Sequence, residues 1–258
     1  MSGQTVADIG EFGLIAALQP RLRTSAAVEV ASGDDAAVVR LGAERLVVST
    51  DMLVQDRHFR LEWSSAEDIG RKAAAQNIAD LSAMGARPVA LTAAIALPPH
   101  TPVEWVLGVV DGLVAEAAQV GAVVVGGDVT RAENVTISVT AMGVPAGSRL
   151  VPRNGAKPGD VVAICGRLGW AAAGLAVLGR GFKSPRVVVD AHRRPHPPYA
   201  AGPAAAAAGA TAMIDVSDGL LADLGHIADA SGVQIVLDSQ LLPIDDQVRA
   251  TASAFNAD

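Results

Sequence analysis

The motif Asp215-Val216-Ser217-Asp218-Gly219 places two carboxylates three residues apart, between an apolar stretch and an amphipathic helical pattern. Four further acidic motifs stand at or near the ends of other expected elements: Gly33-Asp34-Asp35, Ser49-Thr50-Asp51, Asn77-Ile78-Ala79-Asp80 and Gly126-Gly127-Asp128. Carboxylate oxygens are the ligands that Mg²⁺ prefers in proteins. The pattern therefore favours an α/β fold in which acidic turns form a cage for several metal ions.

Each acidic motif also has a simpler reading. An Asp near a strand end is more often a turn former or a helix cap than a metal ligand. Asp218 could merely cap its helix, Asp34 and Asp35 could form a turn, and Asp128 could shape a Gly-Gly-Asp bend. The recurrence of five such motifs in one acidic, lysine-poor chain favours the metal reading.

The sequence offers few other means of binding a polyphosphate. It contains no G-x-x-x-x-G-K-[ST] P-loop, and its only lysines are Lys72, Lys157 and Lys183. The common cradle of backbone amides and a lysine is therefore not available. Mg²⁺ can replace it, because this cation bridges one or two carboxylates to substrate phosphates.

Composition excludes several classes of protein. The chain has 258 residues, of which 50% are hydrophobic and 3% aromatic, so it can form one large or two ordinary α/β domains with real cores. Its formal net charge of -7 argues against general nucleic-acid binding. The single cysteine, Cys165, excludes an intrachain disulfide. No apolar run is long enough to cross a bilayer, and we expect a cytoplasmic protein.

Hydrophobic periodicity predicts alternating strands and helices up to residue 147. A helical pattern at 12–18 is followed by paired strands at 36–40 and 46–49. A long helix begins with a Ser64–Glu67 capping box and ends at Gly85, and a strand follows at 89–97. The second helix opens with a cap at Thr101 and Pro102 at its first position, ends at Gly121, and precedes strands at 123–125 and 135–142.

A new series of elements begins after the Pro145-Ala146-Gly147 break, so we expect domains at 1–147 and 148–258. The predicted elements are a buried strand at 161–165, a helix at 170–178, an irregular connection at 186–199, a helix after Asp218 that ends at Gly232, and a strand at 233–237. Asn77 and Asp80 are three apart on the first long helix, so their side chains should share a face.

Other candidate residues remain open from their local sequence. His58 could be an ordinary surface histidine. Arg153 could be a solvated turn residue or could reach a phosphate. Ser217 has no partner histidine in a recognisable hydrolase motif, so we do not expect it to act as a nucleophile.

The motifs together resemble the thiamine-monophosphate kinase family, a member of the aminoimidazole-ribonucleotide-synthetase-like superfamily. The resemblance spans nearly the whole chain, in the order Gly10-Glu11-Phe12, Gly33-Asp34-Asp35-Ala36, Ser49-Thr50-Asp51, His58-Phe59, Asn77 to Ala86, Gly126 to Arg131, Arg153 to Asp160 and Ile214 to Leu220. It implies a two-domain α/β (α+β) fold of the superfamily type. The N-terminal sheet with its helices would dimerise into a barrel, and an incomplete C-terminal α/β domain would follow.

The resemblance also implies an activity and a set of site residues. The expected reaction is ATP-dependent phosphorylation of thiamine monophosphate to thiamine diphosphate, by direct in-line transfer assisted by several Mg²⁺ ions. Contacts with ATP would fall to Gly127, Asp128, Arg153 and Ser217, and His58 would approach the thiamine phosphate. Metal ligation would fall to Asp35, Ser49, Thr50, Asp51, Asp80, Asp128, Asp215 and Asp218.

Two alternatives accompany this expectation. The chain stops at Asn256-Ala257-Asp258, before the segment with which the family contacts the thiamine moiety. It could therefore be a catalytically impaired form that binds Mg-nucleotide and dimerises. Another ATP-using member of the superfamily, resembling aminoimidazole-ribonucleotide synthetase, is the second alternative.

Overall fold

A computed structural model describes residues 25–30, 34–42 and 44–255 of the chain. The helical pattern expected at 12–18, the Gly10-Glu11-Phe12 motif and Gly33 lie outside these residues. None of the helices in the described part is long and apolar enough to cross a membrane.

The first half of the chain forms a six-stranded sheet in the order β1-β2-β3-β6-β4-β5. Its strands are β1 (Val28–Val30), β2 (Ala37–Leu41), β3 (Glu44–Val54), β4 (Ala86–Leu97), β5 (Val123–Arg131) and β6 (Thr136–Pro145). Neighbouring strands are antiparallel except β4 and β5, which run parallel because a helix connects them. The expected pairing of 36–40 with 46–49 is confirmed by the β2–β3 register.

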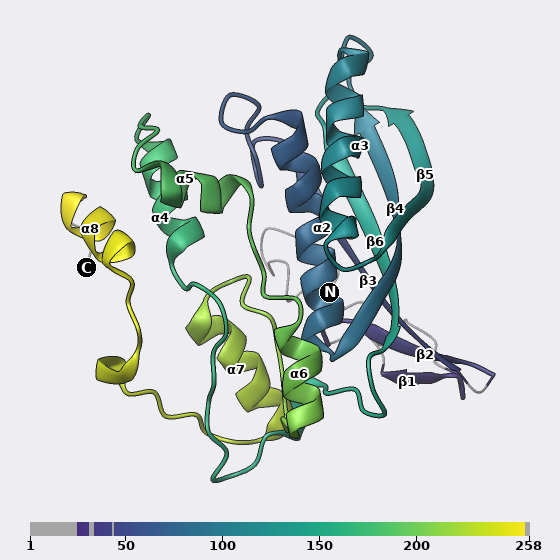
Figure 1. Cartoon of the computed structure of the whole chain (residues 1–258), viewed down its shortest axis with the longest axis vertical. Helices are drawn as coiled ribbons and strands as arrows, with labels where there is room; N and C mark the ends of the chain where they lie inside the picture. The colour runs from purple at the N-terminus through teal and green to yellow at the C-terminus, as the bar shows by residue number, and fades with distance from the viewer. Residues whose placement is uncertain (1–24, 31–33, 43, 256–258) are drawn as a thin grey trace, which may run out of the picture.

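Two long helices, α2 (Ala66–Ala83) and α3 (Val103–Ala118), cover one face of this sheet, and they pack side by side in Figure 1. Glycines bring them close together. A Cβ on Gly70 would lie 2.0 Å from the Val109 carbonyl oxygen, and one on Gly112 would lie 2.2 Å from that of Glu67. The main core fills the space between helices and sheet, with Ile78, Leu91 and Ile137 among its fully or almost fully buried members.

The opposite face of the sheet has no helix on it among the described residues. Alternation along the strands puts Met52 and Val123 on this open face, where they are 52% and 57% exposed. Thr50 and Thr140 also point there, and their hydroxyl oxygens lie 2.8 Å apart across β3 and β6.

The second half of the chain is helical where it is described. It contains α4 (Trp170–Gly179), α5 (Arg186–Arg193), α6 (Ala201–Ala208), α7 (Leu220–Ser231) and α8 (Asp246–Ala254), with short 3-10 turns η2 (Arg153–Gly155) and η3 (Ser239–Leu241). A small second core joins α4 and α5 through Val177, Val188 and Val189. In Figure 1, α4, α5 and α8 lie on the other side of α2 from α3, and α6 lies below α2.

Three contacts fix the C-terminal half against α2 and α3. The Arg194 guanidinium pairs with Asp68 near the start of α2. Tyr199 donates a hydrogen bond of 2.7 Å to the buried Glu116 carboxylate of α3. A Cβ on Gly202 would lie 1.8 Å from the Ser82 carbonyl oxygen, so α6 touches the backbone of α2 directly.

Several expected boundaries need correction. The capping box of α2 is formed by Ser65 and Asp68, one residue later than the predicted Ser64–Glu67 pair. Helix α3 has Pro102 as its N-cap residue, with no side-chain cap from Thr101. Both corrections are one-residue shifts, and α2 ends at Ala83, with its C-cap residue Met84 directly before the predicted stop at Gly85.

The predictions for the second half were wrong at three segments. Residues 161–165 and 233–237 do not form strands; Val161 and Val236 are 89% and 83% exposed, and Cys165 is exposed as well. An apolar run becomes a strand only where a neighbour supplies its backbone partners, and none of the described segments does so here. The connection at 186–199 contains α5, whose buried Val188 and Val189 pack on α4. The end of α7 at Gly232, with φ 65°, is confirmed.

The close packing of α2 on α3 predicts a sharp difference between two Gly→Ala variants. Gly70→Ala should lower the free energy of unfolding by about 1–3 kcal/mol, because its methyl group overlaps the Val109 carbonyl. Gly225→Ala, in α7 with no atom within 4 Å of the added Cβ, should leave stability unchanged or raise it by up to about 1 kcal/mol. Urea unfolding followed by circular dichroism measures both, and equal effects would contradict the packing.

Candidate metal and phosphate site

Strand β3 and helix α2 bring the first group of predicted residues together. The Ser49 hydroxyl donates to the Asp80 carboxylate at 2.6 Å, and the Asp51 backbone N–H donates to the Asn77 side-chain oxygen at 2.9 Å. Asn77 is itself fixed by donation to the Ala73 carbonyl at 2.9 Å. The expectation that Asn77 and Asp80 share a face is confirmed, and that face meets β3.

The second group comes from three segments that are far apart in the sequence. Asp35, in the turn before β2, and Arg153, in η2, form a direct ion pair. The Arg153 backbone N–H also donates to Asp34 at 3.0 Å. Asp215 precedes α7, and the 3-10 turn that carries Arg153 packs against that helix. Residues from positions 34 to 215 therefore meet at one seam.

Electrostatic coupling shows that the two groups share this seam. The pKa of Asp80 is raised to about 8, first by burial and also by the carboxylates of Asp215, Asp51 and Asp35, against a hydrogen bond from Ser49 that lowers it. Burial likewise raises the pKa of Asp35 to about 7, although Arg153 opposes the shift. Four carboxylates from separate parts of the chain are thus close enough to destabilise one another's charge.

The start of α7 extends the cluster. Burial raises the pKa of Asp215 to about 6, with Asp223 as the next cause and with Asp51 and Asp218 contributing. The Asp223 carboxylate accepts backbone N–H groups of Asp218 and Gly219 at 3.2 and 3.0 Å. Gly219 is the N-cap residue and no side chain caps the helix. Asp218 is therefore not a helix cap, and its carboxylate remains exposed beside the cluster.

Comparison with known proteins places the whole chain in one family. Residues 33–145 match the family described as AIR synthase related protein, N-terminal domain, and residues 157–256 match its C-terminal domain. The thiamine-monophosphate kinase of Mycobacterium tuberculosis strain H37Rv is 49% identical over 255 residues, which cover 98% of this chain and 77% of that protein. The chain belongs to the thiamine-monophosphate kinase family.

Further relatives agree with this assignment. The thiamine-monophosphate kinase of Corynebacterium glutamicum is 45% identical over 265 residues, covering 99% of this chain and 78% of that protein. The solved structure of AaThiL complexed with AMPPCP and TMP superposes with a TM-score of 0.92 and 30% identity, over 100% of this chain and 82% of that one. The superfamily fold expected from the motifs is therefore confirmed.

Some predicted site residues lie apart from the cluster in this thiamine-monophosphate kinase family member. The Thr50 hydroxyl points to the open face of the sheet, opposite Ser49 and Asp51, as alternation along a strand requires. Asp128 is exposed on β5 beside Ala94, and its side chain has no hydrogen bond or ion pair among the described residues. Gly127 is required by the sheet itself, because a Cβ there would lie 1.8 Å from the Ala93 carbonyl oxygen.

His58 sits in a tight loop between β3 and α2. Its Nδ1 accepts the Val54 backbone N–H at 2.9 Å, and its own backbone N–H donates to the Val54 carbonyl at 2.9 Å. Burial lowers the pKa of His58, and Lys72 and Arg57 lower it further. A neutral imidazole that accepts at Nδ1 carries its proton on Nε2, so His58 presents an N–H donor.

Two residues of the site were not predicted from the sequence. Asp223 orders the backbone of the Asp215–Gly219 motif, and its position five residues after Asp218, in the first turn of a helix, is the signal that could have found it. Lys72 supports the His58 loop by donating to the His58 carbonyl at 2.9 Å. One lysine in the middle of a helix carries no sequence signal of that contact.

The donor set fits a hard divalent cation. Asp35 has a buried carboxylate oxygen, Oδ2, without a hydrogen-bond partner, and Arg153 is the one cation in ion-pair contact with the clustered carboxylates among the described residues. Within the same residues, no three acidic, histidine or cysteine side chains already have the spacing of a metal site. The carboxylates would therefore have to move closer together to share an ion, and the ion would relieve their mutual repulsion.

The raised pKa values predict how stability depends on pH. Asp80 binds its proton more tightly in the folded chain, with a pKa of about 8, than in the unfolded chain near 3.8. Metal-free protein should therefore lose stability as pH rises from about 4 to 8, because the folded state must give up a proton it holds favourably. Asp80→Asn removes this loss, so in EDTA at pH 8 the variant should melt above wild type, and the gap should close towards pH 4. Thermal unfolding of wild type and variant between pH 4 and pH 8 measures this difference. A variant that melts below wild type at pH 8 would contradict the mutual repulsion of the clustered carboxylates.

Proposed function

We propose that this chain transfers the γ-phosphoryl group of ATP to thiamine monophosphate and releases thiamine diphosphate and ADP. The observation that carries the proposal is the meeting of Asp35, Asp51, Asp80 and Asp215 at one partly buried seam, in a member of a kinase family. A cluster of this charge can hold anionic reactants only through cations.

The expected metal ligands remain Asp35, Ser49, Thr50, Asp51, Asp80, Asp128, Asp215 and Asp218. The geometry favours Asp35, Asp51, Asp80 and Asp215 as the centre of this set, with Asp218 at its exposed rim. Thr50 can take part only through its backbone unless its hydroxyl leaves Thr140. Mg²⁺, when bound, neutralises phosphate charge and orients the two reactants.

The protein's own groups would position the phosphates. Arg153 lies against Asp34 and Asp35 and can present its guanidinium to ATP. Ser217, in the exposed turn before α7, and the backbone of Gly127 and Asp128 are the other expected contacts with ATP. His58 would donate from Nε2–H to the phosphate of thiamine monophosphate. That phosphate is largely ionised near neutral pH, so it attacks in line without a strong general base, and orientation accounts for much of the rate.

The clustered carboxylates give the catalytic prediction. Asp218→Asn should lower kcat/KM for thiamine diphosphate formation at least about 100-fold, because it removes one charge from the phosphate-binding cluster. Asp229→Asn, the same change at an exposed position of α7, should keep wild-type activity. A coupled assay of ADP release with thiamine monophosphate as acceptor measures both, and circular dichroism verifies the fold.

The same assay separates the alternatives. Turnover with formylglycinamidine ribonucleotide in place of thiamine monophosphate would support an aminoimidazole-ribonucleotide-synthetase-like activity. ATP binding in calorimetry without any product would support a chain that binds Mg-nucleotide only. Near-normal activity of Asp218→Asn would contradict the assigned role of the cluster.

We also infer a homodimer built on the open face of the sheet, with domains at 1–147 and 148–258. Support for the domains comes from the two separate apolar cores. Support for the dimer comes from exposed apolar residues on the open face of the sheet, among them Met52 and Val123. Use of ATP and a single unpaired cysteine fit a cytoplasmic location.

The dimer predicts a charge-sensitive sheet face. Val123→Asp places a carboxylate on the open face of β5 and should shift the protein from dimer to monomer in light scattering coupled to gel filtration. Val161→Asp changes a valine that is 89% exposed outside the sheet and should leave the dimer intact. A monomeric wild type, or dissociation by both variants alike, would contradict a dimer through this face.

A further inference from the structure

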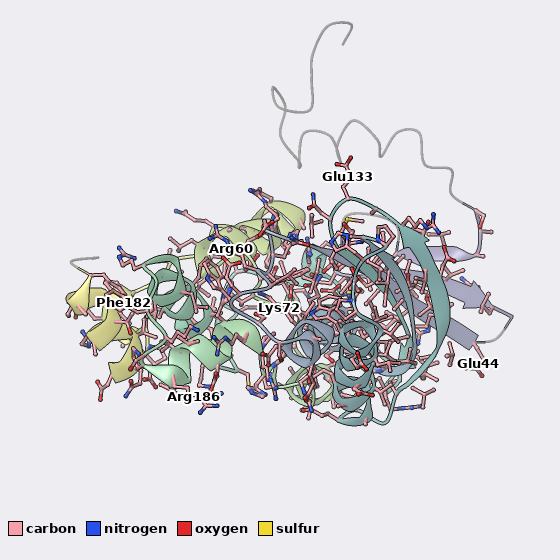
Figure 2. All side chains as sticks on the ribbon, turned by 90° about the horizontal axis from the view of Figure 1, so that it is seen from above. Glu44, Arg60, Lys72, Glu133, Phe182 and Arg186 are labelled. Atoms are coloured by element: carbon pink, nitrogen blue, oxygen red, sulfur yellow. The ribbon has the colours of Figure 1, made fainter. Side chains whose placement is uncertain are left out.

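Lys72 stands apart from the other two lysines. Lys157 and Lys183 are exposed, whereas Lys72 is partly buried on α2, and burial lowers its pKa to about 8. Figure 2 shows Lys72 near the middle of the molecule, between the helices that cover the sheet and the C-terminal helices. Its Nζ donates to the His58 carbonyl at 2.9 Å.

The charge of Lys72 has no counter-ion in the described part of the chain. No carboxylate lies within ion-pair distance of Nζ, and the groups that interact with Lys72 electrostatically are His58 and His192. His192, on α5, is held neutral, because burial and then Lys72 lower its pKa to about 4. Keeping an unpaired ammonium at a half-buried position is costly unless an anion is present in the working state.

Three hydrogen bonds, two with Val54 and one with Lys72, hold His58, and none of them uses Nε2. Val54 fixes the ring through Nδ1 and accepts the backbone N–H, while Lys72 holds the carbonyl. The charged groups that act on the His58 ring are Lys72 from α2, Arg57 from its own loop and Asp51 from β3. Two of these three groups are cations, so the potential they place at the ring is positive and suits a phosphate monoester, while the Asp56 carboxylate of the same loop accepts a hydrogen bond from the Gln55 side chain.

We propose that Lys72 is a positioning residue for the acceptor substrate: its ammonium fixes the His58 loop so that the His58 Nε2–H meets the phosphate monoester, and adds positive potential behind that donor. This assignment rests on the proposed function, because thiamine monophosphate supplies the phosphate. Lys72 acts through His58 and does not touch the transferred group.

Lys72→Met tests the assignment, since methionine keeps a long apolar stem and removes the ammonium. The expected result is an increase of about tenfold in KM for thiamine monophosphate, with KM for ATP and kcat changed less than about threefold. Lys183→Met, at an exposed lysine, should match wild type in all three constants. An equal loss in KM for both substrates, or no change in KM for thiamine monophosphate, would overturn the proposal.

A measurement on the histidine itself does not depend on activity. ¹⁵N-labelled histidine spectra of wild type, with the His58 signal assigned from His58→Gln, should show a neutral ring protonated at Nε2 at pH 7. In Lys72→Met the pKa of His58 should rise towards its ordinary value. A wild-type ring protonated at Nδ1, or an unchanged His58 titration in a folded Lys72→Met, would overturn the proposal.

The two readouts separate this inference from the proposed function. Absence of thiamine diphosphate formation by wild type would count against the proposed function alone. The Lys72 assignment would still be judged by the histidine spectra and by calorimetric titration of thiamine monophosphate into wild type and Lys72→Met. Binding about tenfold weaker in the variant supports it, and equal binding overturns it.

Discussion

Mutual repulsion among half-buried carboxylates is the constraint on which the rest of this structure depends. Two like charges about 4 Å apart repel by about 4 kcal/mol at an effective dielectric near 20. Here Asp35, Asp51, Asp80 and Asp215 meet, and Arg153 forms an ion pair with Asp35. The folded chain tolerates this arrangement because protons or cations can neutralise it. A site that is unfavourable when empty and favourable when filled with divalent cations suits a protein that must bind two anionic substrates together.

The seam exists only because the two halves of the chain are held in a fixed relation. Tyr199 reaches the buried Glu116, which Arg71 also contacts, and burial together with Glu116 raises the pKa of the Tyr199 hydroxyl, so it stays a donor. Arg194 pairs with Asp68 at the start of α2. Asp68 lies on α2, the helix that carries Asp80, and Glu116 lies on the neighbouring α3. These contacts therefore fix the C-terminal half, which supplies Asp215, against the helix that supplies Asp80.

The sequence predicted those parts of the site that follow from local periodicity. Helical spacing placed Asn77 and Asp80 on one face, and strand alternation, applied to β3, explains why Ser49 and Asp51 meet them while Thr50 turns away. Local patterns failed where structure depends on a distant partner. The apolar runs at 161–165 and 233–237 have no paired neighbour, α5 is defined by its contact with α4, and the roles of Asp223 and Lys72 arise from contacts that no short motif encodes.

We propose that aspartates from distant parts of the chain hold divalent ions between the two substrates. Anomalous diffraction from crystals grown with Mn²⁺ and a non-hydrolysable ATP analogue would locate these ions. Manganese peaks are expected within about 2.4 Å of carboxylate oxygens of Asp35, Asp80 and Asp215. Peaks bound elsewhere on the protein, with these three carboxylates free of metal while the nucleotide is bound, would contradict it.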